Sequence, residues 1–361
     1  MPQASLALID LDQTDRLLLN QLQTSFPIEH RPFASLAQAF GISEAACLER
    51  VASLKKKQFI RQISAIFDGK SLGYKSALVA MKIAGEHIGE AAKIINSHPG
   101  VSHNYQRSDV FNLWFTVSVP GDDSLEKTIE VLKKQTGCSE VLFLPALRLY
   151  KIGAKFELGA DYIGPEESRI YSESSRTSDG APLTKTDRNI VRAMQEDLPL
   201  LEMPFAVWAE QAQVSEDQLI AWAKRAIQSG VMRRFSAILY HRNVGLKANM
   251  MVAWRIPEEK IDWAGEEISR FREVSHCYRR TAYPSWPYPV YSMIHGATDA
   301  ECAGVLNKIE ENIGAFPHKI LLTVKEFKKN SLKFFDEELD NWSRQFSKQN
   351  KNVRRGKRNK T

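Results

Sequence analysis

The chain has 361 residues, of which 43% are apolar and 25% are charged, so it is long and apolar enough to form several domain cores. Much of its net charge of +6 comes from the segment at 348–360, which holds seven positive charges and no negative one, so the charge is weak support for nucleic-acid binding. The four cysteines form no C-x-x-C pair, and no apolar run reaches the length of a membrane span or resembles a signal peptide. These features exclude the usual zinc and redox motifs and favour a cytoplasmic protein.

The chain is built from two copies of one unit. Matching segments occur at one constant offset: 14–22 with 186–194, 26–43 with 198–215, and 59–68 with 231–240. The final segments at 141–156 and 319–334 also correspond. A repeat of roughly 150 residues therefore accounts for most of the chain. Between the copies, the segment at 159–182 is rich in Gly, Ser and charged residues and is predicted to be a linker.

The first part of each copy is predicted to be a winged helix-turn-helix. In the first copy, Leu17, Leu18 and Leu22 form the apolar stripe of one short helix. A second helix begins at Pro32, and a third begins after the cap residue Ser43. The segment FIRQISAIFD that follows is expected to fold as a small hairpin, which would be the wing.

The second part of each copy alternates between strands and helices. In the first copy, the expected strands are 75–83, 101–109, 111–119 and 139–152, and the expected helices are 85–98 and 124–137. This βαββαβ order is the ferredoxin-like arrangement. It leaves one face of the sheet without helices, so a partner subunit or the second copy is expected to cover that face.

The predicted fold class is therefore α+β, a tandem duplication of a winged helix-turn-helix plus a ferredoxin-like βαββαβ domain. The expected domains are winged helix-turn-helix 1 at 10–70, ferredoxin-like domain 1 at 71–158, the linker at 159–182, winged helix-turn-helix 2 at 183–242, ferredoxin-like domain 2 at 243–335 and a basic C-terminal tail at 336–361.

The most distinctive pattern is a His-x-Tyr-x-Arg strand that occurs twice, in VSHNYQR and in VSHCYRR. Alternate side chains of a strand share a face. The two sets are His103, Tyr105 and Arg107, and His276, Tyr278 and Arg280. Arg offers a planar donor fork for carboxylates, His can shuttle a proton or bind iron, and Tyr adds a flat ring and a hydroxyl. The pattern indicates an anionic, flat ligand, while a solvent-facing strand or hydrogen bonds between domains is the alternative.

Residues near these strands are further candidates. After the first strand, Asn112 and Trp114 share a face. The same region of the second copy is rich in Pro and aromatic residues, whose rings could wall a pocket or pack in the core: Tyr283, Trp286, Tyr288 and Tyr291. The predicted wings carry Arg61, Arg233 and Arg234, which could contact phosphate, a carboxylated ligand or only water. His98 and His295 are expected at the surface or in turns.

These segments resemble the siroheme decarboxylases, a branch of the leucine-responsive regulatory protein (Lrp/AsnC) family. The resemblance rests on FPIEHRPFASLAQAFGIS, FIRQISAIFD, HPGVSHNYQR and NLWFTV in the first copy and on VSHCYRR and WPYPVYSMIHG in the second. It implies removal of two acetate carboxyl groups from siroheme, giving 12,18-didecarboxysiroheme for alternative heme or heme d1 biosynthesis. It also implies no cofactor beyond the iron of the siroheme substrate. Members usually pair two subunits, so this chain looks like both subunits fused, with its two repeats paired and a further homodimer left open.

The resemblance also implies roles for residues. In each His-x-Tyr-x-Arg set, the histidine is the candidate proton donor, the arginine binds carboxylates and the tyrosine assists as a donor. The catalytic candidates are His103, Tyr105, Arg107, His276, Tyr278 and Arg280. Either His103 or His276 is the candidate ligand of the siroheme iron. The substrate-binding candidates are Arg61, Asn112, Trp114, Arg233, Arg234, Arg279, Trp286, Tyr288 and Tyr291.

One departure from the family pattern concerns the first copy. A further histidine is expected between Arg107 and NLWF, but SDVF stands at 108–111, so the first copy is the candidate for the weaker site. The alternative function is a ligand- or heme-sensing DNA-binding regulator, and a heme-handling chaperone without chemistry is a third option. Both expected recognition helices open with acidic residues, which argues against nucleic-acid binding.

Overall fold

The computed structural model describes residues 11–153, 183–240, 248–339 and 341–342. Within these ranges the chain forms two compact units. The first unit contains both helix-turn-helix domains, the end of the first copy from 147, and most of the second ferredoxin-like domain (248–280 and 287–320). The second unit contains residues 73–146, 281–286 and the described residues from 321 onward.

The predicted linker and most of the predicted tail lie outside the described residues, and the predicted domain boundaries remain predictions. The first residues of the predicted tail are packed in the second unit, where Leu339 is buried and the Trp342 ring lies 3.9 Å from the His98 ring. Among the helices that the structure describes, none is long and apolar enough to cross a membrane.

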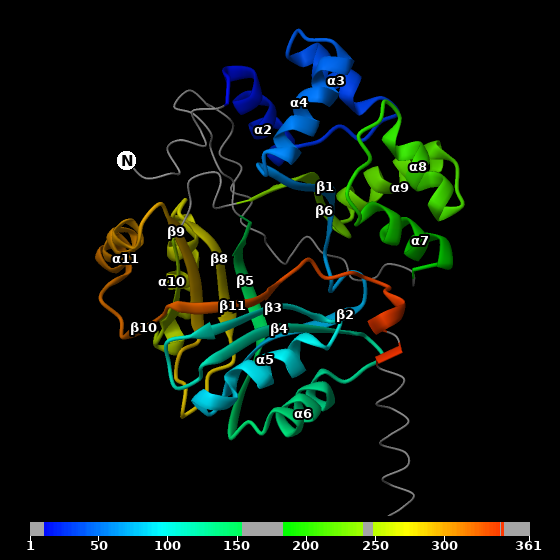
Figure 1. The fold of residues 1–361 in the computed structure, drawn as a ribbon. Coiled ribbons are helices and arrows are strands. Elements are labelled where there is room, and N and C mark those ends of the chain that lie inside the picture. The colour runs from blue at the N-terminus through cyan, green and yellow to red at the C-terminus, as the bar shows by residue number, and fades with distance from the viewer. Residues whose placement is uncertain (1–10, 154–182, 241–247, 340, 343–361) are drawn as a thin grey trace, which may run out of the picture. The chain divides into compact units, whose positions relative to one another are not determined.

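Each helix-turn-helix domain consists of three helices followed by one strand (Figure 1). The first comprises α2 (Gln13–Thr24), α3 (Pro32–Ala39), α4 (Glu44–Lys56) and β1 (Ile60–Phe67), and the second comprises α7 (Lys185–Met194), α8 (Pro204–Ala212), α9 (Glu216–Gln228) and β6 (Met232–Leu239). The Ser43 hydroxyl accepts a hydrogen bond from a backbone N–H in the first turn of α4, so the predicted cap is confirmed, and Ser215 caps α9 in the same way.

The predicted hairpin at 59–68 is wrong. The segment is the single strand β1, which pairs antiparallel with β6 of the second copy. It contains no Gly, Pro or Asn that would turn the chain back on itself. The pairing is reciprocal at equivalent positions, because Phe26 N–H donates to Phe235 O (3.2 Å) and Leu198 N–H donates to Ile63 O (2.8 Å). The two helix-turn-helix domains therefore pair with each other, as the fused-subunit interpretation expects.

The second unit confirms the βαββαβ order. Its elements are β2 (Tyr74–Lys82), η1 (Gly85–His87), α5 (Ile88–Asn96), β3 (Val101–Arg107), β4 (Leu113–Pro120), α6 (Leu125–Thr136) and the first part of β5 (Glu140–Ile152). Helices α5 and α6 cover one face of the sheet (Figure 1), where Ile95 and Ile129 share a core with Phe115 of β4. The strand order is β5-β2-β4-β3-β11, and β11 (Thr323–Lys329) is the last strand of the second copy.

The ferredoxin-like sheet of the first unit mirrors this arrangement. Its elements are β7 (Ala248–Trp254), η3 (Glu258–Lys260), α10 (Ile261–Arg270), β8 (Val274–Arg280), β9 (Val290–Gly296), α11 (Asp299–Ile313) and β10 (His318–Leu321). The end of β5 lies beside β8, where Gly153 N–H donates to Ser275 O (2.9 Å). Tyr150 of β5 packs on Gly265 so closely that a Cβ there would lie 2.3 Å from the ring. Each copy therefore supplies its last strand to the sheet of the other copy.

Candidate active site

Three side chains of β8 form a stack that we name the second ridge: His276, Tyr278 and Arg280. The rings of His276 and Tyr278 have centroids 6.3 Å apart and planes inclined by 18°. The guanidinium carbon of Arg280 lies 4.6 Å from the centre of the Tyr278 ring and 5.9 Å from that of Tyr291. The shared face predicted from strand alternation is confirmed.

The second ridge holds partly buried polar groups. Burial raises the pKa of Tyr278, against the weaker opposing effect of the Arg280 charge, so the phenol keeps its proton. Burial lowers the pKa of the Arg280 guanidinium. A buried cation of this kind is stabilised by an anionic partner. The second ridge is therefore suited to hold an anionic group beside Arg280.

The equivalent side chains of β3 form the first ridge: His103, Tyr105 and Arg107. The rings of His103 and Tyr105 have centroids 6.2 Å apart and planes inclined by 29°. Arg107 is 5% exposed, and its Nη1 donates to Leu321 O (2.8 Å) and to Thr323 Oγ1 (2.9 Å). Burial lowers the pKa of Arg107 to about 10. The Arg107 guanidinium therefore holds the end of β10 and the start of β11.

Tyr283 of the second copy lies in the second unit, where its hydroxyl donates a hydrogen bond to the Phe143 carbonyl (2.7 Å).

A bulge precedes the histidine of each ridge. The strand register shifts just before His103 and just before His276. Bulges re-aim side chains and recur beside active sites. Each preceding serine hydroxyl lies near Nδ1 of its histidine, at 3.0 Å for Ser102 and at 2.7 Å for Ser275. Strand alternation placed these serines on the opposite face, so sequence reasoning missed them; the repeated Ser-His pair was the available signal.

His295 does not lie at the surface or in a turn, so that expectation is wrong for this residue. It is half-buried on β9, and its Nε2 lies 2.7 Å from Ser275 Oγ, the hydroxyl that also contacts His276. In the first copy the equivalent residue is Ser118, because His295 and Ser118 make matching backbone hydrogen bonds beside their strands (2.9 Å each). Ser118 Oγ instead contacts Ser76 Oγ at 2.7 Å.

His98 lies in a turn, as one expectation allowed, but it is fully buried. Its Nδ1 accepts a hydrogen bond from Gly100 N–H (2.9 Å), and burial lowers the pKa of the imidazole to about 4. These contacts give His98 a structural role in the second unit.

The predicted substrate-binding arginines have varied surroundings. On β6, Nε and Nη2 of Arg233 donate to Oδ2 of Asp68 at 3.0 Å and 2.6 Å, and Asp68 is fully buried. Tyr240 stands at the matching position of the second copy, so this ion pair is not repeated. Arg279 pairs with Glu258 on the helix side of β8. Arg61 and Arg234 are half-buried on β1 and β6.

The predicted aromatic and amide ligands mostly have defined packing roles. In the second unit, Asn112 binds both backbone groups of Ile83, and Trp114 donates Nε1–H to Phe111 O (2.6 Å). The Trp286 ring lies 5.7 Å from that of Trp114, and both indoles are 1% exposed. In the first unit, Tyr288 is half-buried, and Tyr291 is buried beside Arg280. Tyr291 adjoins the second ridge through its contact with Arg280, and Trp114 is the strand neighbour of Tyr105 in the first ridge.

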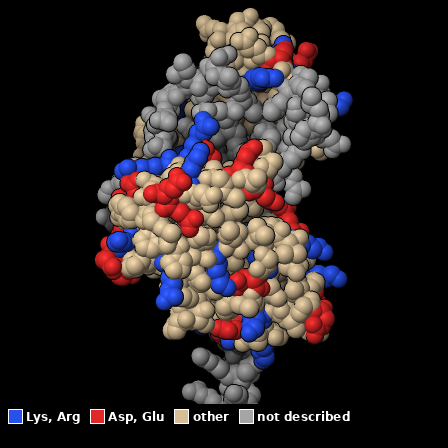
Figure 2. Space-filling model, turned by 90° about the vertical axis from the view of Figure 1, so that its left-hand side faces the viewer, with Lys and Arg blue, Asp and Glu red and all other residues tan. Residues whose placement is uncertain are grey.

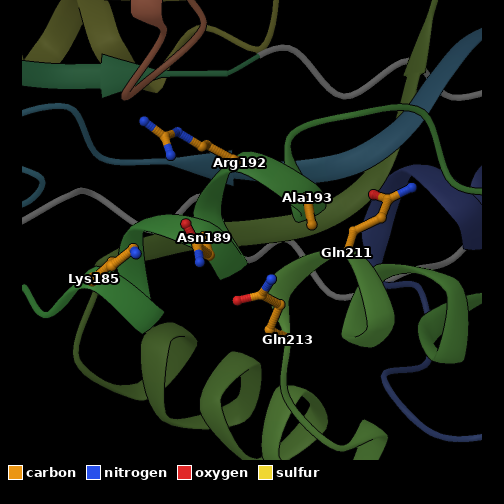
Figure 3. Close-up of a pocket in the computed structure, with 6 residues that line it drawn as sticks. All are labelled: Lys185, Asn189, Arg192, Ala193, Gln211 and Gln213. Carbon is orange, nitrogen blue, oxygen red and sulfur yellow. The ribbon is translucent and has the colours of Figure 1, made fainter.

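A pocket of 360 Å³ lies within the second helix-turn-helix domain (Figure 3). Its lining residues are Lys185, Asn189, Arg192, Ala193, Gln211 and Gln213. They come from α7, α8 and the residue after α8, and none of them belongs to either ridge.

The first turns of α4 and α9 are acidic and already paired. His30 Nδ1 lies 2.7 Å from Glu216, its Nε2 lies 2.9 Å from Asp217, and the Glu216 contact raises the pKa of His30. Arg31 bridges Glu44 and Glu202. Figure 2 shows acidic and basic side chains mingled on one face of the molecule, without a basic stripe. The paired acidic side chains of these first turns are unfavourable for DNA binding.

Comparison with known proteins shows the family of the chain. The model of the AsnC-like ligand binding domain matches residues 71–151 and 243–328, and the siroheme decarboxylase NirDL-like HTH domain matches 15–61 and 187–233. The siroheme decarboxylase of Hydrogenobacter thermophilus is 36% identical over 90% of this chain and 96% of its own length. The chain belongs to the siroheme decarboxylase family.

Further members support the same family and fold. The siroheme decarboxylase NirDL subunit of Paracoccus denitrificans is 30% identical over 88% of this chain and 96% of its own length. The crystal structure of the siroheme decarboxylase NirDL matches with a TM-score of 0.74 and 32% identity over 94% of this chain and 100% of that chain. A second NirDL structure, in complex with an iron-uroporphyrin III analogue, matches with a TM-score of 0.72 and 31% identity over 92% and 97% of the two chains.

These matches confirm the expected resemblance and the α+β tandem fold of this siroheme decarboxylase family member. Both family models match twice, once in each copy. The two ridges nevertheless differ in their surroundings. The first is anchored to β11 through Arg107, and the second contacts a second imidazole through Ser275.

Proposed function

We propose that the protein decarboxylates siroheme, removing two acetate carboxyl groups to give 12,18-didecarboxysiroheme for heme or heme d1 synthesis. The related NirDL crystallised with an iron-uroporphyrin III analogue supports a flat, multiply anionic iron tetrapyrrole as the ligand. The observation that carries the proposal is the second ridge, which aligns a half-buried imidazole, phenol and guanidinium along one strand.

The chemistry requires a proton and a firm hold on the carboxylates. In each event the bond between the acetate methylene and its carboxyl carbon breaks, carbon dioxide leaves, and one proton is taken up as the side chain becomes methyl. Protonation of the ring carbon that bears the acetate lets the macrocycle accept the electron pair of the broken bond. A positioned acid and a fixed substrate orientation both accelerate such a step.

Residues of the second ridge match these needs. His276 is the proposed proton donor, with ligation of the siroheme iron by His276 or His103 as the other role of these imidazoles. Arg280 would bind a carboxylate of siroheme, which would also relieve the cost of burying its charge. Tyr278, whose pKa is raised by burial, would donate a hydrogen bond from its phenol. Further side chains of the first unit that we propose to contact siroheme are Tyr291, Arg233 and Arg234.

The second ridge is the better candidate for the working site. In the first ridge Ser118 stands where the second has His295, the imidazole that contacts Ser275. The residues after Arg107 also lack the histidine that the family pattern leads us to expect. We propose no cofactor beyond the iron of siroheme, a cytoplasmic location, and a homodimer of chains whose two repeats are paired.

The test is anaerobic incubation of the protein with siroheme, followed by mass analysis of the extracted tetrapyrrole. Loss of two carbon dioxide units is expected. His276→Ala should abolish turnover, and Arg280→Met should raise KM for siroheme. Arg270→Gln is the matched control, because Arg270 is exposed on α10 and pairs with Glu267 of the same helix. Recovery of intact siroheme from the unmodified protein would refute the proposed reaction.

A further inference from the structure

We propose that His295 is a positioning residue of the second ridge, acting through Ser275 to fix the orientation and tautomer of the His276 imidazole. This inference rests on the proposed function. The three side chains form a chain of contacts, because Ser275 Oγ lies 2.7 Å from His276 Nδ1 and 2.7 Å from His295 Nε2. Ser275 is buried, so its hydroxyl is well placed to retain these partners.

A single hydroxyl proton constrains both rings. Ser275 Oγ can donate to one ring nitrogen only, and it must accept from the other if both short contacts are hydrogen bonds. Its other acceptor, Met293 O, lies farther away at 3.5 Å. The tautomers of the His295 and His276 rings are therefore linked. Because Nδ1 of His276 is engaged by the serine, the contact also sets whether Nε2, the nitrogen that would serve the ligand, carries the proton.

The first copy shows the contacts of the equivalent serine and histidine when the second imidazole is absent. Ser118 stands at the position of His295, and it contacts Ser76. The Ser102 hydroxyl then lies 3.0 Å from His103 Nδ1, compared with 2.7 Å in the second ridge. The His103 and Tyr105 planes are inclined by 29°, compared with 18° for His276 and Tyr278. In the second ridge the contact between serine and imidazole is thus shorter, and the imidazole is more nearly parallel to its tyrosine.

The position of His295 supports a role beyond packing. Its backbone N–H is satisfied by Glu273 O, and its side chain crosses to the neighbouring strand to reach Ser275. Groups that orient a reactive or metal-binding imidazole through its second nitrogen typically contribute about 10- to 100-fold in activity or affinity. The same order of effect is expected here, and it should fall on turnover, because His295 is not proposed to touch siroheme.

The experiment compares His295→Leu, His295→Gln and Ser275→Ala with the unmodified protein in anaerobic siroheme turnover. Leu removes the hydrogen bond, whereas Gln keeps a donor and an acceptor at similar reach. We expect His295→Leu and Ser275→Ala each to lower kcat by about 10- to 100-fold with KM changed less than about threefold, and His295→Gln to restore most of the loss. The double variant Ser275→Ala/His295→Leu should be no slower than Ser275→Ala, because both changes break one chain of contacts.

Ser118→Ala is the matched control from the first copy, and it should leave kcat and KM unchanged. A kcat for His295→Leu equal to that of the unmodified protein would overturn the inference. Equal losses in His295→Leu and His295→Gln, accompanied by a lower Tm, would also overturn it, because they would indicate a purely structural residue. Failure of the unmodified protein to release carbon dioxide would instead refute the proposed function. Full activity of His276→Ala would refute the role given to that histidine.

Discussion

Arg107 and Arg280 occupy matching positions, and under the proposed function their removal should have different consequences. Arg107→Met removes the hydrogen bonds to Leu321 O and Thr323 Oγ1, at the junction of β10 and β11, and keeps most of the apolar volume. Hydrogen bonds from a charged donor contribute about 1.5–3 kcal/mol each. Against this, burial lowers the pKa of Arg107 to about 10, which corresponds to roughly 3 kcal/mol that disfavours the buried charge. The net loss expected at β11 is therefore about 1–2 kcal/mol.

Amide hydrogen exchange along β11 is the suitable assay, because unfolding of a protein with two compact units need not be two-state. A loss of about 1–2 kcal/mol should accelerate exchange of the β11 amides by about 5- to 30-fold. Thr323→Val removes one acceptor only and should accelerate exchange by less. In the double variant the two effects should not add, because both act on one hydrogen-bonded group.

Siroheme affinity supplies the contrast. Arg107→Met should change it little, whereas Arg280→Met should weaken it markedly, since a lost carboxylate contact to a charged donor is worth about 1.5–3 kcal/mol. Unchanged exchange in β11 together with a large loss of siroheme affinity in Arg107→Met would refute the assignment of Arg107 as a strand anchor. It would also restore the first ridge as a binding site.

Three further perturbations test the packing of the first unit. Gly265→Ala should lower the free energy of unfolding by about 1–3 kcal/mol, because its Cβ would clash with the Tyr150 ring, and Tyr150→Leu in the same chain should recover part of the loss in a denaturant titration. Asp68→Asn should cost about 3–5 kcal/mol by leaving Arg233 without its buried anion, while the double change Asp68→Asn/Arg233→Gln should cost less; equal losses in thermal unfolding would contradict the ion-pair argument. The pKa of His30 is raised in the folded state by Glu216, so its stabilising contribution is fully present below pH 6.5 and is lost as pH rises through the raised value. His30→Gln should flatten the decline of Tm above pH 6.5, and an unchanged pH profile would show that the contact is too exposed to matter.

Much of the fold could be predicted because its signals are local. The Ser43 cap and the start of α3 at Pro32 occur where the sequence places them. The wing was predicted wrongly because the partner of β1 is β6, a strand of the other copy, and nothing inside FIRQISAIFD reports a partner so far along the chain. Strand pairing between distant segments is the part of a fold that local patterns specify least.

The candidate site divides in the same way. Alternation correctly placed His276, Tyr278 and Arg280 on one face, since that property depends only on a strand being present. The role of Arg107 depends on Leu321 and Thr323, which approach it only in the folded chain. The contact of Ser275 with His295 depends on a bulge that breaks strict alternation. Residues missed from the sequence are thus those whose function comes from neighbours supplied by another strand.

The last strand of each copy, β5 or β11, pairs with a strand of the other copy, and this exchange determines where the chain can be divided. A cut between the copies would leave in place the described pairing of β11 with β3 and of β5 with β8, which is compatible with relatives named as separate alpha and beta subunits that each match about two-fifths of this chain. Removing β11 would have the opposite effect, because β3 would become an edge strand with unpaired backbone N–H and C=O groups. Such an edge can pair with a strand of another molecule and promote aggregation. Mutual completion of the two sheets, rather than the peptide connection, is what makes the halves interdependent.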